Sequence, residues 1–104
     1  MPESIIVKIQ NLLDKKNRID LHDREKLKVL LFDLENEIKY LHTSRIDDAK
    51  KLLKVAYKVI YEVEKKSTSD TSDLYDAALG FEVDHPKITY IVQSICQTLA
   101  NIGI

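Results

Sequence analysis

The sequence predicts an all-α protein, a small bundle of four to five helices. Two glycines and two prolines in 104 residues are too few for a turn-rich β architecture. Apolar residues make up 44% of the chain and charged residues 32%, a composition that can form a packed core. Apolar residues also recur at steps of three and four. We therefore expect one helical domain over residues 1–104, with a polar linker at residues 66–72 inside it.

The second predicted helix has the most regular apolar pattern. A first helix is expected from about Ser4 to Lys16, ending at Asn17, and Asp20 suits the N-cap of a second helix reaching about Leu41. Steps of four, three, four and three residues, typical of a coiled-coil seam, join its main apolar positions: Leu27, Leu31, Leu34, Ile38 and Leu41. Three further apolar residues fall on the opposite side: Val29, Phe32 and Tyr40. Two apolar sides indicate two neighbours.

The third predicted helix, about Arg45 to Lys66, is apolar over about half of its circumference. Such a helix should lie centrally and contact more than one neighbour. Ser44 and Asp47 resemble a capping box at its start. Because the connection to the second helix is short, we expect these two helices to form a central antiparallel hairpin.

The C-terminal third predicts a short helix and then a longer one. The short helix is expected over about Asp73 to Val83, and Pro86 suits the first position of a last helix that reaches about Asn101. Gly103 and Ile104 fit a C-terminal cap. The apolar seam of the last helix contains Ile88, Val92, Ile95, Leu99 and Ile102, with Ile91 beside it.

The last helix carries no charged side chain after Lys87. Its outer side is either a neutral surface facing water or a surface covered by a subunit, since interface centres are depleted of charge. Insertion along a membrane surface is disfavoured, because such helices usually carry Lys or Arg. The candidate interface residues are Val29, Phe32, Tyr40, Tyr90, Ile91, Ile95, Leu99 and Ile102.

Charge is distributed unevenly along the chain. Residues 1–66 hold 15 basic and 12 acidic residues, a balance of +3, whereas residues 67–104 hold one basic and five acidic residues, a balance of −4. The two parts could attract each other within a chain or between chains, and neither is basic enough to indicate nucleic acid strongly. No window reaches the roughly 20 apolar residues that span a bilayer. A single cysteine, Cys96, favours a reducing, cytoplasmic setting and suggests a buried, inert thiol.

One segment resembles a known family. The run Gly80-Phe-Glu-Val-Asp-His-Pro86, with a Leu-Ala-Asn-Ile-Gly-Ile ending, resembles the small bacterial domain of unknown function 4404 family. Members of that family end in a Phe-Glu-x-x-His-Pro segment, an amphipathic helix and a terminal Gly-Ile. Residues of about 43–68 depart from the pattern and look like an additional helix. The resemblance implies no activity, only that the C-terminal segment is a unit with a purpose.

The segment before the last helix is a candidate functional junction, formed by Phe81, Glu82, His85 and Pro86. Glu82 and His85 have the Glu-x-x-His spacing of di-iron bundles, which need two such motifs and further carboxylates. Because the chain has only one such motif, we keep a metal- or ligand-binding bundle as an alternative hypothesis and not as the leading one. The simpler interpretation is that His85 caps the last helix and its ring bonds a carboxylate or carbonyl.

Lysines on the third helix suggest a further alternative. Lys51, Lys54, Lys58 and Lys65 share one side, typical of a solvated surface but also compatible with an anion or nucleic acid. The sequence has no glycine-rich phosphate loop and no Ser-His-Asp pattern, so we expect neither an enzyme nor a cofactor. The leading hypothesis is an interaction module that acts as a homo-oligomer, most simply a dimer, with an unidentified protein as a possible further partner.

Overall fold

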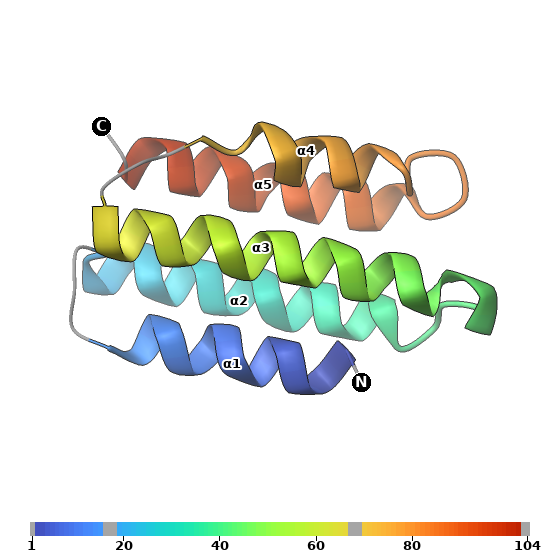
Figure 1. Ribbon diagram of the computed structural model, residues 1–104, viewed down its shortest axis with the longest axis horizontal. Coiled ribbons are helices and arrows are strands. Elements are labelled where there is room, and N and C mark those ends of the chain that lie inside the picture. Colours follow the sequence, from blue (N-terminus) through green and yellow to red (C-terminus); the bar gives the residue numbers. More distant parts are fainter. Residues whose placement is uncertain (1, 16–18, 67–69, 103–104) are drawn as a thin grey trace.

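The computed structural model describes residues 2–15, 19–66 and 70–102. The prediction of an all-α bundle is confirmed, because five α-helices and one 3-10 turn make up most of the described chain (Figure 1). The helices are α1 (Pro2–Asp14), α2 (Leu21–Ile38), α3 (Ile46–Lys66), α4 (Ser72–Leu79) and α5 (Pro86–Ile102), and the 3-10 turn η1 spans Thr43–Arg45. The predicted stop at Asn17, residues 67–69 of the linker and the predicted cap at Gly103 and Ile104 lie outside the described residues.

The helices form a closed ring around one apolar interior. Each helix runs opposite to the one before it in sequence (Figure 1). α1 packs beside α2 and α3, α5 packs beside α2 and α4, and α4 also contacts α3. The order around the ring is therefore α1, α2, α5, α4, α3.

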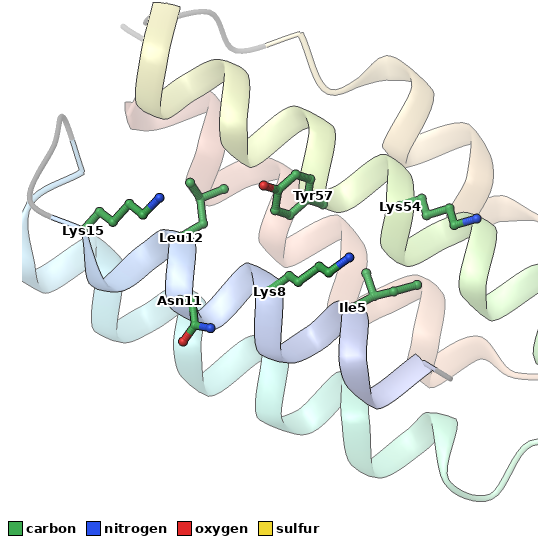
Figure 2. Close-up of a pocket in the computed structure, with 7 residues that line it drawn as sticks. All are labelled: Ile5, Lys8, Asn11, Leu12, Lys15, Lys54 and Tyr57. Atoms are coloured by element: carbon green, nitrogen blue, oxygen red, sulfur yellow. The ribbon is translucent and has the colours of Figure 1, made fainter.

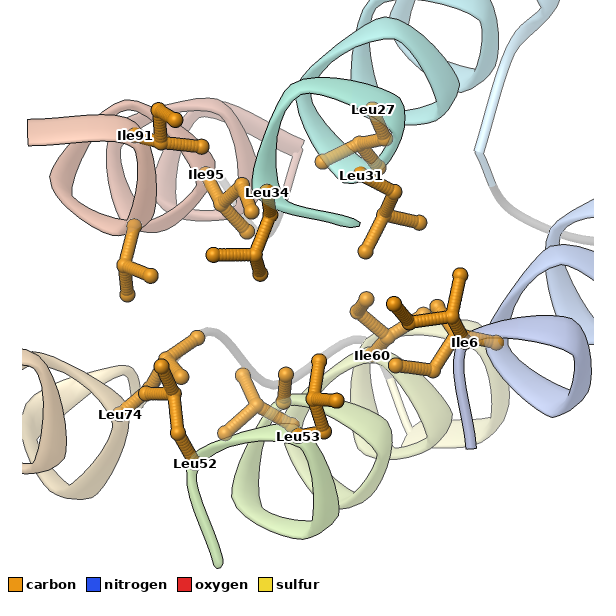
Figure 3. Close-up of a cluster of buried hydrophobic side chains, with 14 of the residues drawn as sticks. Ile6, Leu27, Leu31, Leu34, Leu52, Leu53, Ile60, Leu74, Ile91 and Ile95 are labelled. Carbon is orange, nitrogen blue, oxygen red and sulfur yellow. The ribbon is translucent and has the colours of Figure 1, made fainter. Parts of the chain in front are cut away.

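This order corrects one detail of the expected hairpin. α2 and α3 are antiparallel, but the main neighbours of α2 are α1 and α5, and those of α3 are α1 and α4. Figure 3 shows Leu27, Leu31 and Leu34 of α2 on one side of the interior and Leu53 and Ile60 of α3 on the other. Each of the two helices has a wide apolar side that contacts several neighbours. They can therefore lie on opposite sides of the core, with other helices between them.

The start of α2 follows the predicted capping chemistry. The Asp20 carboxylate accepts a hydrogen bond from the Asp23 backbone N–H at 2.9 Å, which satisfies a donor that the first helical turn leaves unpaired. The predicted seam of α2 is buried throughout, with no member more than 8% exposed.

The connection between α2 and α3 differs from the prediction. α2 ends at Ile38, three residues early, and the chain continues in turns through Leu41. The Ser44 and Asp47 capping box does not begin α3, because the His42 ring accepts from the Ser44 backbone N–H at 3.1 Å and starts η1 instead. α3 then begins at Ile46.

The C-terminal helices are joined by a tight turn. α4 ends at Leu79, not Val83, and residues 80–84 form turns stabilised by backbone hydrogen bonds such as His85 N–H to the Phe81 carbonyl at 2.8 Å. Pro86 begins α5, as predicted. The buried Thr89 hydroxyl donates to the Ala78 carbonyl at 2.8 Å and so ties α5 to α4.

The shared interior predicts a large effect of one core truncation. Leu53 is fully buried in α3, so Leu53→Ala should lower the free energy of unfolding by about 2 to 5 kcal/mol. Lys58→Ala, on the exposed side of the same helix, should change it by less than about 0.5 kcal/mol. Urea denaturation followed by circular dichroism measures both values. Equal stability of the two variants would contradict the described packing.

Candidate functional site

The junction before α5 is held by a residue that the sequence did not single out, Arg45. Phe81 is 2% exposed and enters the core from the α4–α5 turn. The Arg45 guanidinium carbon lies 4.4 Å from the centre of the Phe81 ring, within cation–π distance. Arg45 stands just before α3, so this contact joins the start of α3 to the turn before α5.

Arg45 also forms polar contacts with both segments. Its Nη1 donates to the Asp48 carboxylate at 2.9 Å, and its Nη2 donates to the Gly80 carbonyl at 2.7 Å. Its Nε lies 3.0 Å from the Asp84 carboxylate. We name Arg45, Asp48, Phe81 and Asp84 the Arg45 cluster. A planar guanidinium fits these roles because its donors and its faces point in different directions.

His85 and Glu82 occupy less constrained positions. The His85 ring Nε2 is 3.8 Å from the Asp84 carboxylate, and the His85 carbonyl accepts from the Ile88 N–H at 3.0 Å in the first turn of α5. The carbonyl contact fits the predicted cap of α5, whereas the distance from the ring to Asp84 is longer than a hydrogen bond, so the predicted ring bond to this carboxylate is not formed. Glu82 is exposed. No group of three or more His, Cys, Asp or Glu side chains with metal-binding geometry occurs among the described residues, so the metal alternative gains no further ligand.

The candidate interface residues divide into two groups. Val29, Phe32, Tyr40 and Tyr90 are exposed by 57 to 83%. Ile91, Ile95 and Leu99 are at most 9% exposed and pack inside the chain's own core, and Ile102 is partly buried against it. The seam of α5 therefore cannot be offered to a second subunit in the folded chain, and that part of the expected interface is corrected.

The lysines of α3 border different hollows. Lys51 lies on the α4 side, in a hollow also lined by Arg45 and Asp48. Lys54 lies on the α1 side and borders a groove between α1 and α3. Lys65 sits 6.0 Å from the ring centre of Tyr61. All four lysines of this side are exposed, and two of them, Lys51 and Lys54, border hollows on opposite edges of it.

Cys96 is buried in α5, as predicted. Burial raises the pKa of its thiol above the ordinary value, and the Sγ lies 4.0 Å from the Thr71 carbonyl oxygen. A protonated, buried thiol is a poor nucleophile, so this geometry does not favour a catalytic cysteine.

These observations define a small helical bundle whose α4–α5 junction is held by Arg45 and which has large exposed apolar side chains on and just after α2 and at Tyr90 of α5. The chain belongs to a family described as a domain of unknown function, DUF4404, which matches residues 3–104. The resemblance inferred from the C-terminal segment is therefore confirmed. The match spans residues 43–68, and α3 in that range supplies buried residues of the core, so this helix is integral to the fold.

Comparison with curated proteins gives no match, and comparison with solved structures gives none either. Within the ranges that the structure describes, no helix has both the length and the apolar character needed to cross a membrane.

The Arg45 cluster predicts a local and a global effect. Arg45→Gln should lower the free energy of unfolding by about 1 to 3 kcal/mol, because it removes charge-assisted hydrogen bonds and the ring contact. Arg45→Lys should recover only part of this loss, since lysine lacks the fork geometry. Amide hydrogen exchange at residues 80–85 should become faster in both variants. Lys51→Gln is the matched control, and full stability of Arg45→Lys would contradict the geometric argument.

Because Cys96 is buried, we expect its thiol to react slowly in the folded chain. At pH 8 the folded chain should react with a colorimetric disulfide reagent at least about tenfold more slowly than the urea-unfolded chain. Because the folded chain holds the thiol proton more tightly, the free energy of unfolding should fall as the pH rises above the thiol's ordinary pKa. Cys96→Ala should remove that part of the pH dependence, and equal reaction rates in the two states would contradict the burial.

Proposed function

We propose that this protein is a non-catalytic interaction module that self-associates as a dimer. The proposed interface is the α2/α5 face, defined by Val29, Phe32, Tyr40 and Tyr90. The observation that carries the proposal is the exposure of these four large apolar side chains, each more than half accessible. Val29 and Phe32 lie on α2 and Tyr40 in the turn after it, and Tyr90 lies on α5, which packs beside α2. Scattered single exposed apolar residues need no explanation, but a group of this kind is typical of an interaction surface.

The spacing of residues on both helices supports one continuous face. Val29 and Phe32 lie three residues apart on the side of α2 opposite its buried seam, and Tyr40 follows in the turn after the helix. On α5, the outward positions at and after Tyr90 include Ser94 and Gln97, which are neutral. The α5 part of the face is therefore neutral after Lys87, as in the charge-depleted centres of protein interfaces, whereas charged residues such as Asp33 lie on its α2 part.

The charges at one hollow of this face favour a second copy of the chain as the occupant. The hollow between α2 and α5 is lined by Asp33, Asn36, Glu37, Lys87, Tyr90 and Ile91. None of the ion pairs among the described residues includes Lys87, Asp33 or Glu37. A face with both signs of charge in one place can be its own complement across a two-fold axis. Lys87 of each copy would then meet the two carboxylates of the other.

We expect the dimer to be of moderate affinity. Full burial of a large apolar side chain contributes about 1.5 to 3 kcal/mol, whereas association costs at least about 4 kcal/mol in lost freedom of motion. Because the four side chains are already partly buried in the single chain, their remaining gain is of a size similar to this cost. We therefore expect a reversible dimer whose population rises with protein concentration.

Sedimentation velocity from low to high micromolar concentration tests the proposal. The wild-type chain should shift from monomer toward dimer, and a variant with Phe32→Ser and Tyr90→Ser should remain a monomer. Val83→Ser removes an apolar side chain that is 97% exposed outside the face and should leave the dimer unchanged. A wild-type monomer at high micromolar concentration would refute the proposal.

A charge exchange tests the two-fold arrangement separately. Lys87→Glu should weaken the dimer because it places like charges together across the axis. Adding Asp33→Lys to this variant should restore much of the association. Persistent weakness of the double variant, with an intact helical circular dichroism spectrum, would argue against the proposed pairing of charges.

A further inference from the structure

A groove between α1 and α3 gathers positive charge over an apolar floor. It has a volume of about 540 Å³ and is lined by Ile5, Lys8, Asn11, Leu12, Lys15, Lys54 and Tyr57. Figure 2 shows Lys8 and Lys15 rising from α1, while Lys54 and Tyr57 come from α3 and the Tyr57 hydroxyl is directed toward Leu12. None of the described residues that line this groove is acidic.

The packing of the two helices explains the groove's apolar floor. α1 and α3 run side by side in the same direction (Figure 1). Leu12 is 3% exposed and Ile5 is partly buried, so the apolar side chains lie low between the helices. The lysines lie higher on the walls, where their aliphatic stems can cover apolar surface while the ammonium groups reach water.

The positive charge of the groove is not neutralised by its nearest described carboxylate on α1. Asp14 pairs with Lys28 of α2, on the other side of α1. None of the ion pairs among the described residues includes Lys8, Lys15 or Lys54. Aromatic surface continues along α3, because Tyr57 stacks on Tyr61 with ring centres 6.2 Å apart. Three like charges around one hollow favour an anion as occupant.

The shape and chemistry narrow the kind of anion. A volume of this size lies in the range of small-molecule sites, which combine a mainly apolar lining with a few polar groups. Lysine ammonium groups act as point charges and impose no fixed bidentate geometry, so they accept a carboxylate or a phosphate. The Asn11 amide and the Tyr57 hydroxyl add hydrogen-bonding capacity. An apolar chain attached to the anion would lie over Ile5 and Leu12.

We propose that this groove binds a soluble amphipathic anion, with a carboxylate or phosphate head held between Lys8 and Lys54, an acyl chain running along the apolar floor toward Leu12, and Lys15 adding positive charge at the other end. The site lies on a different pair of helices from the α2/α5 face, and this inference does not depend on self-association.

Isothermal titration with straight-chain carboxylates, below the concentrations at which they form micelles, tests both parts of the site. From hexanoate to decanoate the affinity should rise by roughly three- to fourfold per methylene, as expected when a CH₂ group leaves water. Acetate and inorganic phosphate, which lack the chain, should bind far more weakly. Octyl glucoside, which has a chain but no charge, should also bind far more weakly than decanoate.

Matched variants separate a specific site from general attraction. Lys8→Gln with Lys54→Gln should raise the Kd for decanoate by about tenfold or more. Lys26→Gln with Lys39→Gln removes the same charge from exposed positions on and just after α2 and should change the Kd by less than about twofold. Circular dichroism confirms that each variant is folded. An equal loss in both pairs, or an affinity independent of chain length, would overturn the proposal.

Amide chemical-shift mapping locates the bound molecule. Decanoate should shift the signals of Lys8, Asn11 and Tyr57 and leave those of Phe32 and Tyr90 unchanged. Decyl phosphate should shift the same signals, since the proposal assigns the site to the shared chemistry of the two heads. Shifts confined to the α2/α5 face, or binding only to anionic phosphatidylglycerol vesicles and not to the soluble amphiphile, would refute the assigned site.

Discussion

The five helices of the described chain share one apolar interior, and all but α4 pack against a helix that is not adjacent to them in sequence. α2 and α3 face each other across that interior, with α1 between them on one side and α4 and α5 on the other. Removing α1 would open one side of the core, and displacing α4 and α5 would open the other. Closure of the ring is therefore the constraint on which the fold depends. It also determines which apolar residues remain outside, because each helix can turn only one side inward.

The Arg45 cluster lies where α3 meets the α4–α5 turn, a connection that helps to close the ring of helices. α4 is only eight residues long, and short helices are marginal without tertiary contacts. Arg45 joins the start of α3 to the α4–α5 turn through the Gly80 carbonyl, the Asp84 carboxylate and the face of the buried Phe81 ring. The segment from Phe81 to Pro86 contains residue types that suggest a chemical function. Its contacts show that these residues mainly stabilise the fold. Of its two acidic residues, Asp84 pairs with Arg45, and its aromatic residue Phe81 fills the core.

The two proposed surfaces differ in the physical term that would drive binding. On the α2/α5 face, large apolar side chains are exposed and α5 is neutral after Lys87, so removal of apolar area from water would supply most of the energy and the charges around Lys87 would orient the two copies. In the α1/α3 groove, the apolar surface lies low and the charge lies at the rim, so attraction to an anion would select the ligand and apolar contact would strengthen it. The uneven distribution of charge along the sequence already indicates that the N-terminal part, which contains the groove, is basic. The location of the groove depends on α1 and α3 being neighbours, which no local pattern indicates.

The sequence alone determined the helical class, the N-cap at Asp20, the start of α5 at Pro86 and the buried seam of α2, because these follow from local hydrogen bonding and from apolar spacing. It also identified Val29, Phe32, Tyr40 and Tyr90 as surplus apolar residues. Only the tertiary structure decided that Ile95 and Leu99 are buried in the chain's own core, and that α2 and α3 lie opposite each other. It likewise revealed the roles of Arg45 and of the groove lysines. Apolar periodicity states that a side of a helix will be buried, but which helix covers it depends on packing among segments far apart in the chain.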